Sequence, residues 1–120
     1  GINLSGGQKQ RLTLARALVR EPTIVIFDDT LSAVDAKTEE AILERLLSYA
    51  RRRTAILISH RLTAAQRASR VLVLGRGRLV EEGTHAELLK KGGIYAELHH
   101  KQQLEAALEA EAEGRKEAVA

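Results

Sequence analysis

Two carboxylates and a histidine follow two short apolar segments of this 120-residue chain. Asp28 and Asp29 end the apolar run 24–27, and His60 closely follows a second apolar run at 54–58. Ligands of open α/β sheets bind beyond the carboxyl ends of the strands. If the two runs are neighbouring strands, the three side chains share one sheet edge, where they could bind a charged ligand and move a proton. Aspartates that only cap a turn or a helix are the alternative.

A serine and two glycines at the start of a helical pattern suit the binding of an anion. Ser5 is a good N-cap residue, and Gly6 and Gly7 let the backbone approach a ligand closely. The free N–H groups and the dipole of a helix start attract phosphate. Gln8 adds a neutral amide donor. An ordinary serine-capped helix is the alternative, and the Ser-Gly-Gly run alone favours that alternative.

Strand and helix signals alternate along the chain, which predicts an α/β fold. Apolar runs without polar alternation, such as 23–27, are typical of strands covered on both faces. Gly75 and Gly77 lie between two short strand signals and predict a hairpin, while Thr84 and Glu87 have the spacing of a capping box. The predicted helices are 8–20, 36–49, 64–68, a short helix after 84, and 94–113; the predicted strands are 23–27, 54–59, 71–74 and 78–80.

The motifs and their order resemble the C-terminal half of an ATP-binding-cassette (ABC) ATPase domain. The similar segments are 4–18 (the signature motif and its helix), 24–29 (the Walker B strand), 30–35 (the D-loop) and 59–62 (the switch region). Segments 77–85 and 93–95 are similar to those of ABC exporters. The resemblance covers residues 1 to about 98.

This resemblance implies a partial P-loop NTPase-like fold, a mostly parallel sheet flanked by helices with a C-terminal helix. Residues 1–95 would be the C-terminal part of the nucleotide-binding domain, 96–113 the C-terminal helix and 114–120 a frayed tail. The chain contains no G-x-x-x-x-G-K-[ST] motif. We therefore expect the Walker A motif upstream, and we expect this fragment alone to bind ATP poorly and to be inactive.

The resemblance also implies ATP and Mg²⁺ as cofactors. Asp28 would hold Mg²⁺ through water, Asp29 would occupy the position of the catalytic acid, and His60 would contact the γ-phosphate. In the family, two nucleotide-binding domains enclose two ATP molecules head to tail. The segment Ser5 to Gln8 and the D-loop residue Asp35 would then contact ATP held mainly by the second domain. Transmembrane domains of the same chain and a place at the cytoplasmic face of the cell membrane follow from the exporter resemblance.

Asp29 departs from the family pattern, which has glutamate after the Walker B aspartate. Aspartate has the same charge but is one methylene shorter, and a misplacement of about 1 Å can cost on the order of 10²-fold in rate. We therefore expect a slow ATP site in this chain beside an intact signature motif. A heterodimer with a non-identical partner is the leading hypothesis, and a homodimer with a slow base is the alternative.

The amino-acid composition bears on the alternative functions of the chain. The chain has no cysteine, a formal net charge of +3 and almost no aromatic residues, so stacking on nucleic acid bases is not expected. A soluble ABC ATPase of the DNA-maintenance or ribosome-acting type remains open, as does a catalytically inactive scaffold subunit. Three further histidines, His85, His99 and His100, are interpreted as solvated residues rather than metal ligands.

Overall fold

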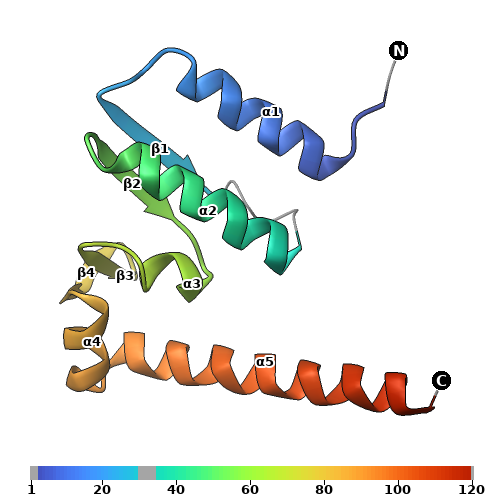
Figure 1. Cartoon of the computed structure of the whole chain (residues 1–120). Coiled ribbons are helices and arrows are strands. Elements are labelled where there is room, and N and C mark those ends of the chain that lie inside the picture. Colours follow the sequence, from blue (N-terminus) through green and yellow to red (C-terminus); the bar gives the residue numbers. More distant parts are fainter. Residues whose placement is uncertain (1–2, 30–34, 120) are drawn as a thin grey trace. The chain divides into compact units, whose positions relative to one another are not determined.

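The computed structural model describes residues 3–29 and 35–119 (Figure 1). The chain divides into two compact units, Gly1–Ala64 and Ala65–Ala120. Each unit is described by itself. Both the class of fold and the order of the helices and strands are those that the sequence predicts.

The first unit is built around a strand–helix–strand motif. Strand β1 (Ile24–Asp28) and strand β2 (Thr54–Ile58) pair in parallel and are joined through helix α2 (Ala36–Ala50). Helix α1 (Gly6–Leu18) precedes them, and the short helix α3 (Leu62–Ala65) follows (Figure 1). A parallel pair needs a long crossover, which α2 provides. The register aligns the two strand ends, because Asp28 lies opposite Ile58.

One face of this small sheet carries the hydrophobic core of the unit. Side chains of β1 alternate between the faces, as expected for a strand, and Val25 and Phe27 are buried. The helices α1 and α2 cover this face. The buried cluster consists of Leu14, Val25, Phe27, Leu43, Leu46 and Ala64.

The opposite face of the sheet is apolar and exposed within the described residues. Ile24, Ile26, Ile56 and Ile58 keep 46–60% of their surface accessible. The prediction that the first strand is covered on both faces is therefore wrong for this part of the chain. The apolar run remains explicable, because parallel strands are normally buried on both sides. Asp28 lies on this open face, since it alternates with the buried Phe27.

The second unit is a hairpin followed by two helices. Strand β3 (Val71–Gly75) pairs antiparallel with strand β4 (Arg78–Gly83). Arg76 and Gly77 form the two-residue loop, both with positive φ (50° and 74°), which is the backbone that tight hairpins favour. The predicted hairpin is confirmed. Helix α4 (His85–Lys91) begins with the predicted capping box, in which the Thr84 and Glu87 side chains bond each other's backbone N–H groups.

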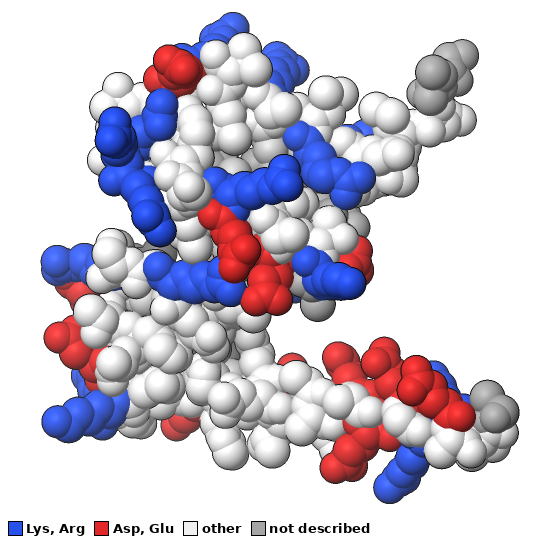
Figure 2. Space-filling model, viewed as in Figure 1, with Lys and Arg blue, Asp and Glu red and all other residues white. Residues whose placement is uncertain are grey.

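Helix α5 (Ile94–Val119) is longer than the sequence predicts. Its expected end was near Glu113, but the helix continues through Gly114. Glycine costs about 1 kcal/mol in a helix, and the surrounding Ala, Glu, Lys and Arg residues are strong helix formers that can offset this cost. Figure 2 shows acidic side chains gathered over the distal half of α5.

A buried carboxylate holds the start of α5. Glu81 on β4 is 7% exposed, and its two carboxylate oxygens accept backbone hydrogen bonds from Ile94 (3.2 Å) and Tyr95 (2.9 Å). Those N–H groups belong to the first turn of α5, which has no intrahelical acceptors for them. A negative charge at this end also suits the helix dipole. Gly93 leaves room for this contact, because a Cβ at that position would overlap the Glu81 carboxylate and displace it.

We expect Glu81→Ala to lower the free energy of unfolding of the protein by about 3 kcal/mol, since hydrogen bonds to charged groups contribute roughly 1.5–3 kcal/mol each. Glu82→Ala is the matched control on the same strand. Glu82 pairs with Arg70, whose side chain is 70% exposed, and exposed pairs contribute at most about 1 kcal/mol. Urea unfolding followed by circular dichroism measures both. Equal losses for the two variants would contradict the capping role of Glu81.

Two of the histidines interpreted as solvated have partners in the second unit. Nδ1 of His85 lies 2.8 Å from the hydroxyl oxygen of Tyr95, and the rings of His85 and His99 are 5.3 Å apart between centroids. Tyr95 is 1% exposed, and burial raises the pKa of its hydroxyl. The interpretation holds only in part: His100 is exposed, whereas His85 and His99 are half-buried because α5 packs beside α4 after the turn at Gly92, which spacing along the chain does not reveal.

Candidate functional site

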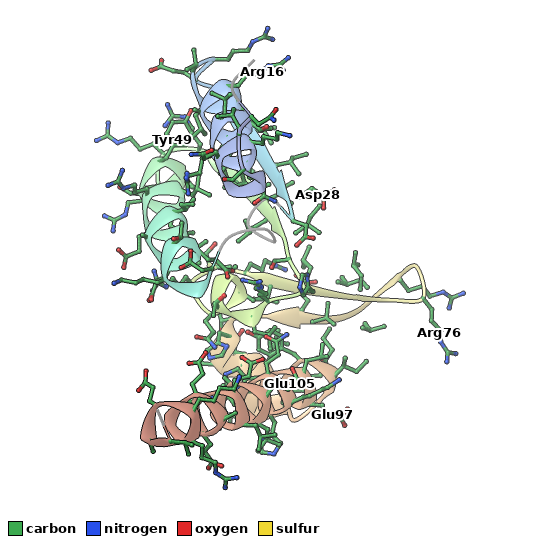
Figure 3. The ribbon with its side chains drawn as sticks, turned by 90° about the vertical axis from the view of Figure 1, so that its right-hand side faces the viewer. Arg16, Asp28, Tyr49, Arg76, Glu97 and Glu105 are labelled. Atoms are coloured by element: carbon green, nitrogen blue, oxygen red, sulfur yellow. The ribbon has the colours of Figure 1, made fainter. Side chains whose placement is uncertain are left out.

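The end of the parallel sheet gathers the predicted catalytic residues. Asp28 is the last residue of β1, and the N–H of Asp29 donates to the carbonyl of Ile58 across the pair (2.9 Å). His60 follows the end of β2, and its Nδ1 lies 3.3 Å from Oδ1 of Asp29. The expectation that these side chains lie at one edge of the sheet is therefore confirmed. Figure 3 shows Asp28 at the tip of β1.

Both members of the Asp29–His60 contact remain open to solvent. The Asp29 side chain is 51% exposed and that of His60 is 68% exposed. The contact is a hydrogen bond when the imidazole is neutral and an ion pair when it is protonated. Two exposed groups of this kind can accept a proton from a ligand that arrives from solution, or donate a proton to it.

The backbone of Asp29 is in the left-handed region, with φ of 46°. Few residues other than glycine adopt this conformation, and aspartate and asparagine do so more often than the rest. Strained backbone of this kind clusters at functional sites.

The start of α1 is a complete capping box. Oγ of Ser5 accepts from the N–H of Gln8 (3.2 Å), and Oε1 of Gln8 accepts from the N–H of Ser5 (2.9 Å). The N–H of Lys9 bonds to the carbonyl of Ser5. The first-turn N–H groups that remain are those of Gly6 and Gly7. Sequence analysis missed the reciprocal role of Gln8, although the Ser-x-x-Gln spacing is a known signal of a capping box.

Asp35 caps helix α2. Its carboxylate accepts from the N–H of Thr38 (3.0 Å). Hydrogen bonds from the Thr38 side chain first, and from its backbone N–H second, hold the pKa of Asp35 below its usual value. The rest of the segment that resembles a D-loop, residues 30–34, lies outside the described residues. Asp35 thus has a structural role at the helix start, and a contact with nucleotide remains a prediction.

We expect Asp35→Ala to lower the melting temperature of the protein by a few degrees, while Asp35→Asn retains most of the cap. A group whose pKa is lowered by folding adds stability above its unfolded pKa, about 4 for aspartate, and loses it as the pH falls through the folded value. The difference between wild type and Asp35→Ala should therefore shrink below about pH 4. Thermal unfolding at several pH values measures it. A constant difference down to pH 2 would argue against this role.

One pair near the site escaped sequence analysis. Glu39, in the first turn of α2, is 6% exposed and forms an ion pair with the guanidinium of Arg61. Arg61 directly follows His60, and its N–H donates to Oγ of Ser59 (3.0 Å). The sequence does place an acidic residue, Glu39, at an otherwise apolar face of the helix. It does not identify the partner, because Arg61 lies 22 residues further along the chain.

The residues that could hold a cofactor are few. Among the described residues, no group of three or more acidic, histidine or cysteine side chains is placed to hold a metal ion. Mg²⁺ is often bound by one or two carboxylates together with nucleotide phosphates and water. Asp28, exposed at a sheet edge, fits this incomplete kind of site. The Gly6 and Gly7 N–H groups at the start of α1 fit a phosphate oxygen.

Comparison with known proteins agrees with this geometry. A family model described as ABC transporter matches residues 1–32. The multidrug resistance-like ATP-binding protein MdlA of Escherichia coli is 46% identical over 119 residues, which are 99% of this chain and 20% of that protein. The mitochondrial potassium channel ATP-binding subunit of Pongo abelii is 51% identical over 106 residues, 88% of this chain and 15% of that protein.

A solved structure shares the fold. The structure of a bacterial Atm1-family ABC exporter with ATP bound aligns with a TM-score of 0.80 and 46% identity, over 83% of this chain and 18% of that chain. The chain belongs to the ABC transporter family. It spans a fifth or less of the length of these relatives. Within the described residues, no helix is both long and apolar enough to cross a membrane.

Proposed function

We propose that the chain is the C-terminal part of the ATP-binding domain of an ABC exporter, which hydrolyses ATP to move a substrate across a membrane. The observation that carries the proposal is the edge of the parallel sheet. Pairing of β1 with β2 brings Asp28, Asp29 and His60 together at this edge. The same chain is 46% identical to an exporter with ATP bound.

At the chain's own ATP site, separate roles belong to Asp28, Asp29 and His60. Asp28 would hold Mg²⁺, and that ion would neutralise charge on the phosphates. His60 contacts the γ-phosphate. Asp29 orients the attacking water and can accept its proton, but its short side chain already contacts His60 at 3.3 Å. Support for a slow site comes from this contact together with the missing methylene.

The start of α1 serves a second ATP site. Ser5 and Gln8 stabilise the helix start through their capping box, which leaves the Gly6 and Gly7 N–H groups for the γ-phosphate of ATP bound by a partner domain. The absence of a side chain at both glycines allows a phosphate to approach the backbone closely. Asp35 keeps α2 in place through its cap, and in this proposal it also contacts ATP.

The partner in this proposal is a non-identical ATP-binding subunit. An intact signature segment beside an altered Walker B acid means that this chain completes an efficient site on its partner while hosting a slow one. Transmembrane domains of the same protein place the assembly at the cytoplasmic face of the cell membrane. One relative carries the word mitochondrial in its name, so an organelle membrane is the alternative location.

The exposed apolar face of the first unit supports a larger domain. Ile24, Ile26, Ile56 and Ile58 would be covered by upstream parts of the full protein, which also supply the Walker A motif. In this proposal the isolated chain does not hydrolyse ATP, because it lacks the Walker A motif.

The test is site-resolved hydrolysis of ATP by the full-length protein in lipid, alone and with a candidate partner. Turnover that increases when both subunits are present, with slower hydrolysis at the site of this chain, supports the proposal. Full activity of the protein alone indicates a homodimer. Nucleotide binding without any hydrolysis at this chain's site indicates a scaffold subunit, and activity without a membrane indicates a soluble ABC ATPase.

A further inference from the structure

We propose that Glu39, acting through Arg61, is a positioning residue that sets the orientation of His60 at the ATP site. This inference rests on the proposed function, because it concerns the same hydrolysis step. The chain of contacts runs from the first turn of α2 through the Glu39–Arg61 ion pair to the loop after β2, and from His60 to Asp29.

The exposures of these side chains decide which of them anchors the others. The His60 side chain is 68% exposed, so packing alone holds it weakly. The Glu39 side chain is 8% exposed and lies on a regular helix, and its N–H bonds to the carbonyl of Asp35 (2.8 Å). Arg61 connects this fixed carboxylate to the residue next to His60.

The loop between β2 and α3 is held on both sides of His60. Before it, Oγ of Ser59 accepts from the N–H of Arg61 (3.0 Å), which closes a tight turn around the histidine. After it, the Arg61 guanidinium bonds Glu39, and Leu62 is buried at 8% exposure. The backbone of His60 therefore follows any displacement of Arg61. A shift of about 1 Å in a group that contacts a reacting phosphate can cost on the order of 10²-fold in rate.

Stability alone does not account for this pair. The Glu39 side chain is 8% exposed and the Arg61 side chain 35% exposed, so the pair is largely but not fully buried. Replacing a buried ion pair by well-packed apolar residues is often neutral or stabilising, because charges lose hydration when they are buried. A buried acid in the first turn of α2 is better explained by the specific position that it imposes on its partner. The pair also joins the helix capped by Asp35 to the residue that follows His60, which links the start of α2 to the edge of the sheet.

The experiment uses single-turnover hydrolysis at this chain's own site in the full-length transporter. In Glu39→Gln we expect the rate of the chemical step to fall about 10-fold or more, with the Kd for ATP changed less than about 3-fold, because ATP is held mainly by other residues. The decisive arm places Glu39→Gln in a His60→Ala background. If Glu39 acts through His60, adding Glu39→Gln to the His60→Ala protein causes no further loss of rate.

Two further variants separate positioning from folding. Glu39→Met with Arg61→Leu removes the pair but leaves no buried charge, so this double variant should fold and show the same rate loss as Glu39→Gln. Arg70→Gln is the matched control, because it breaks another Arg–Glu pair in the second unit and should keep the wild-type rate. Bound ATP per molecule reports the folded fraction of each protein.

The outcomes distinguish the inference from the proposed function. A wild-type protein that never hydrolyses ATP defeats the proposed function, and with it the basis of the inference. Wild-type hydrolysis with an unchanged rate in the folded Glu39→Gln and double variants overturns the inference alone. Equal losses from Glu39→Gln in the wild-type and His60→Ala backgrounds also overturn it, because the effect would then be independent of His60.

Discussion

Gly7→Asp should reduce ATP hydrolysis by the assembled transporter at least about 100-fold while this subunit still binds ATP. The N–H group of Gly7 is one of two first-turn donors of α1 left by the capping box. The aspartate keeps the backbone N–H, but its side chain blocks the approach of the γ-phosphate to that donor, and loss of a single hydrogen bond to a transition-state charge costs roughly 10²–10³-fold. The added carboxylate also repels the γ-phosphate. ATP binding persists because the proposed contact of Gly7 is with the nucleotide of the partner.

The helix itself should tolerate this change. No acidic residue lies in the first turn of α1, and a negative charge there stabilises a helix by about 0.3–1 kcal/mol. Replacing glycine inside a helix also favours the helical state. Gly7→Ala is therefore the matched control, because it adds a Cβ without charge and should lose less activity than Gly7→Asp.

Site-resolved turnover and nucleotide occupancy measure the result. If Gly7→Asp empties this chain's own site and the partner continues to hydrolyse ATP, the assignment of α1 to the partner's nucleotide is wrong. A Gly7→Asp protein with normal turnover would show that the start of α1 does not contact phosphate at all.

Local signals were sufficient for most of the fold. The apolar runs predicted β1 and β2, and their parallel pairing placed the sheet edge at Asp28 and His60. The hairpin and the capping box at Thr84 were also predicted, because both depend on residues within a few positions of one another. The very short helix α3 was displaced from its predicted range 64–68, since its position depends on the burial of Leu62 and Ala64 rather than on a periodic pattern.

Contacts between distant residues were beyond the reach of the sequence. Nothing local pairs Glu39 with Arg61, because the crossover helix must fold onto the sheet before the two meet. The same holds for Tyr95 and His85, which come together only after the turn that follows α4. The Asp29–His60 distance required a register that aligns the two strand ends. Motif spacing therefore predicted which residues lie together at this edge of the sheet, but not the contacts that hold them there.

Asp29→Glu should increase hydrolysis at this chain's own site by about 10-fold or more. The aspartate oxygen lies 3.3 Å from His60, so a longer side chain can reach beyond the histidine toward an attacking water. Recovery of a misplacement of about 1 Å accounts for a gain of this size. The variant should also lower the melting temperature slightly, because Asp29 has φ of 46°, a conformation that glutamate adopts less readily than aspartate.

Asp29→Asn provides the matched control for charge. Asparagine has the size of aspartate and tolerates the same backbone, but it cannot accept a proton from water. We expect turnover at this site to fall below the wild-type rate in Asp29→Asn and to rise above it in Asp29→Glu. Single-turnover hydrolysis with bound ATP counted for each variant measures both. A folded, ATP-bound Asp29→Glu protein with an unchanged or lower rate would mean that the length of this side chain does not limit hydrolysis. The contact with His60 or the left-handed backbone of residue 29 would then limit the rate.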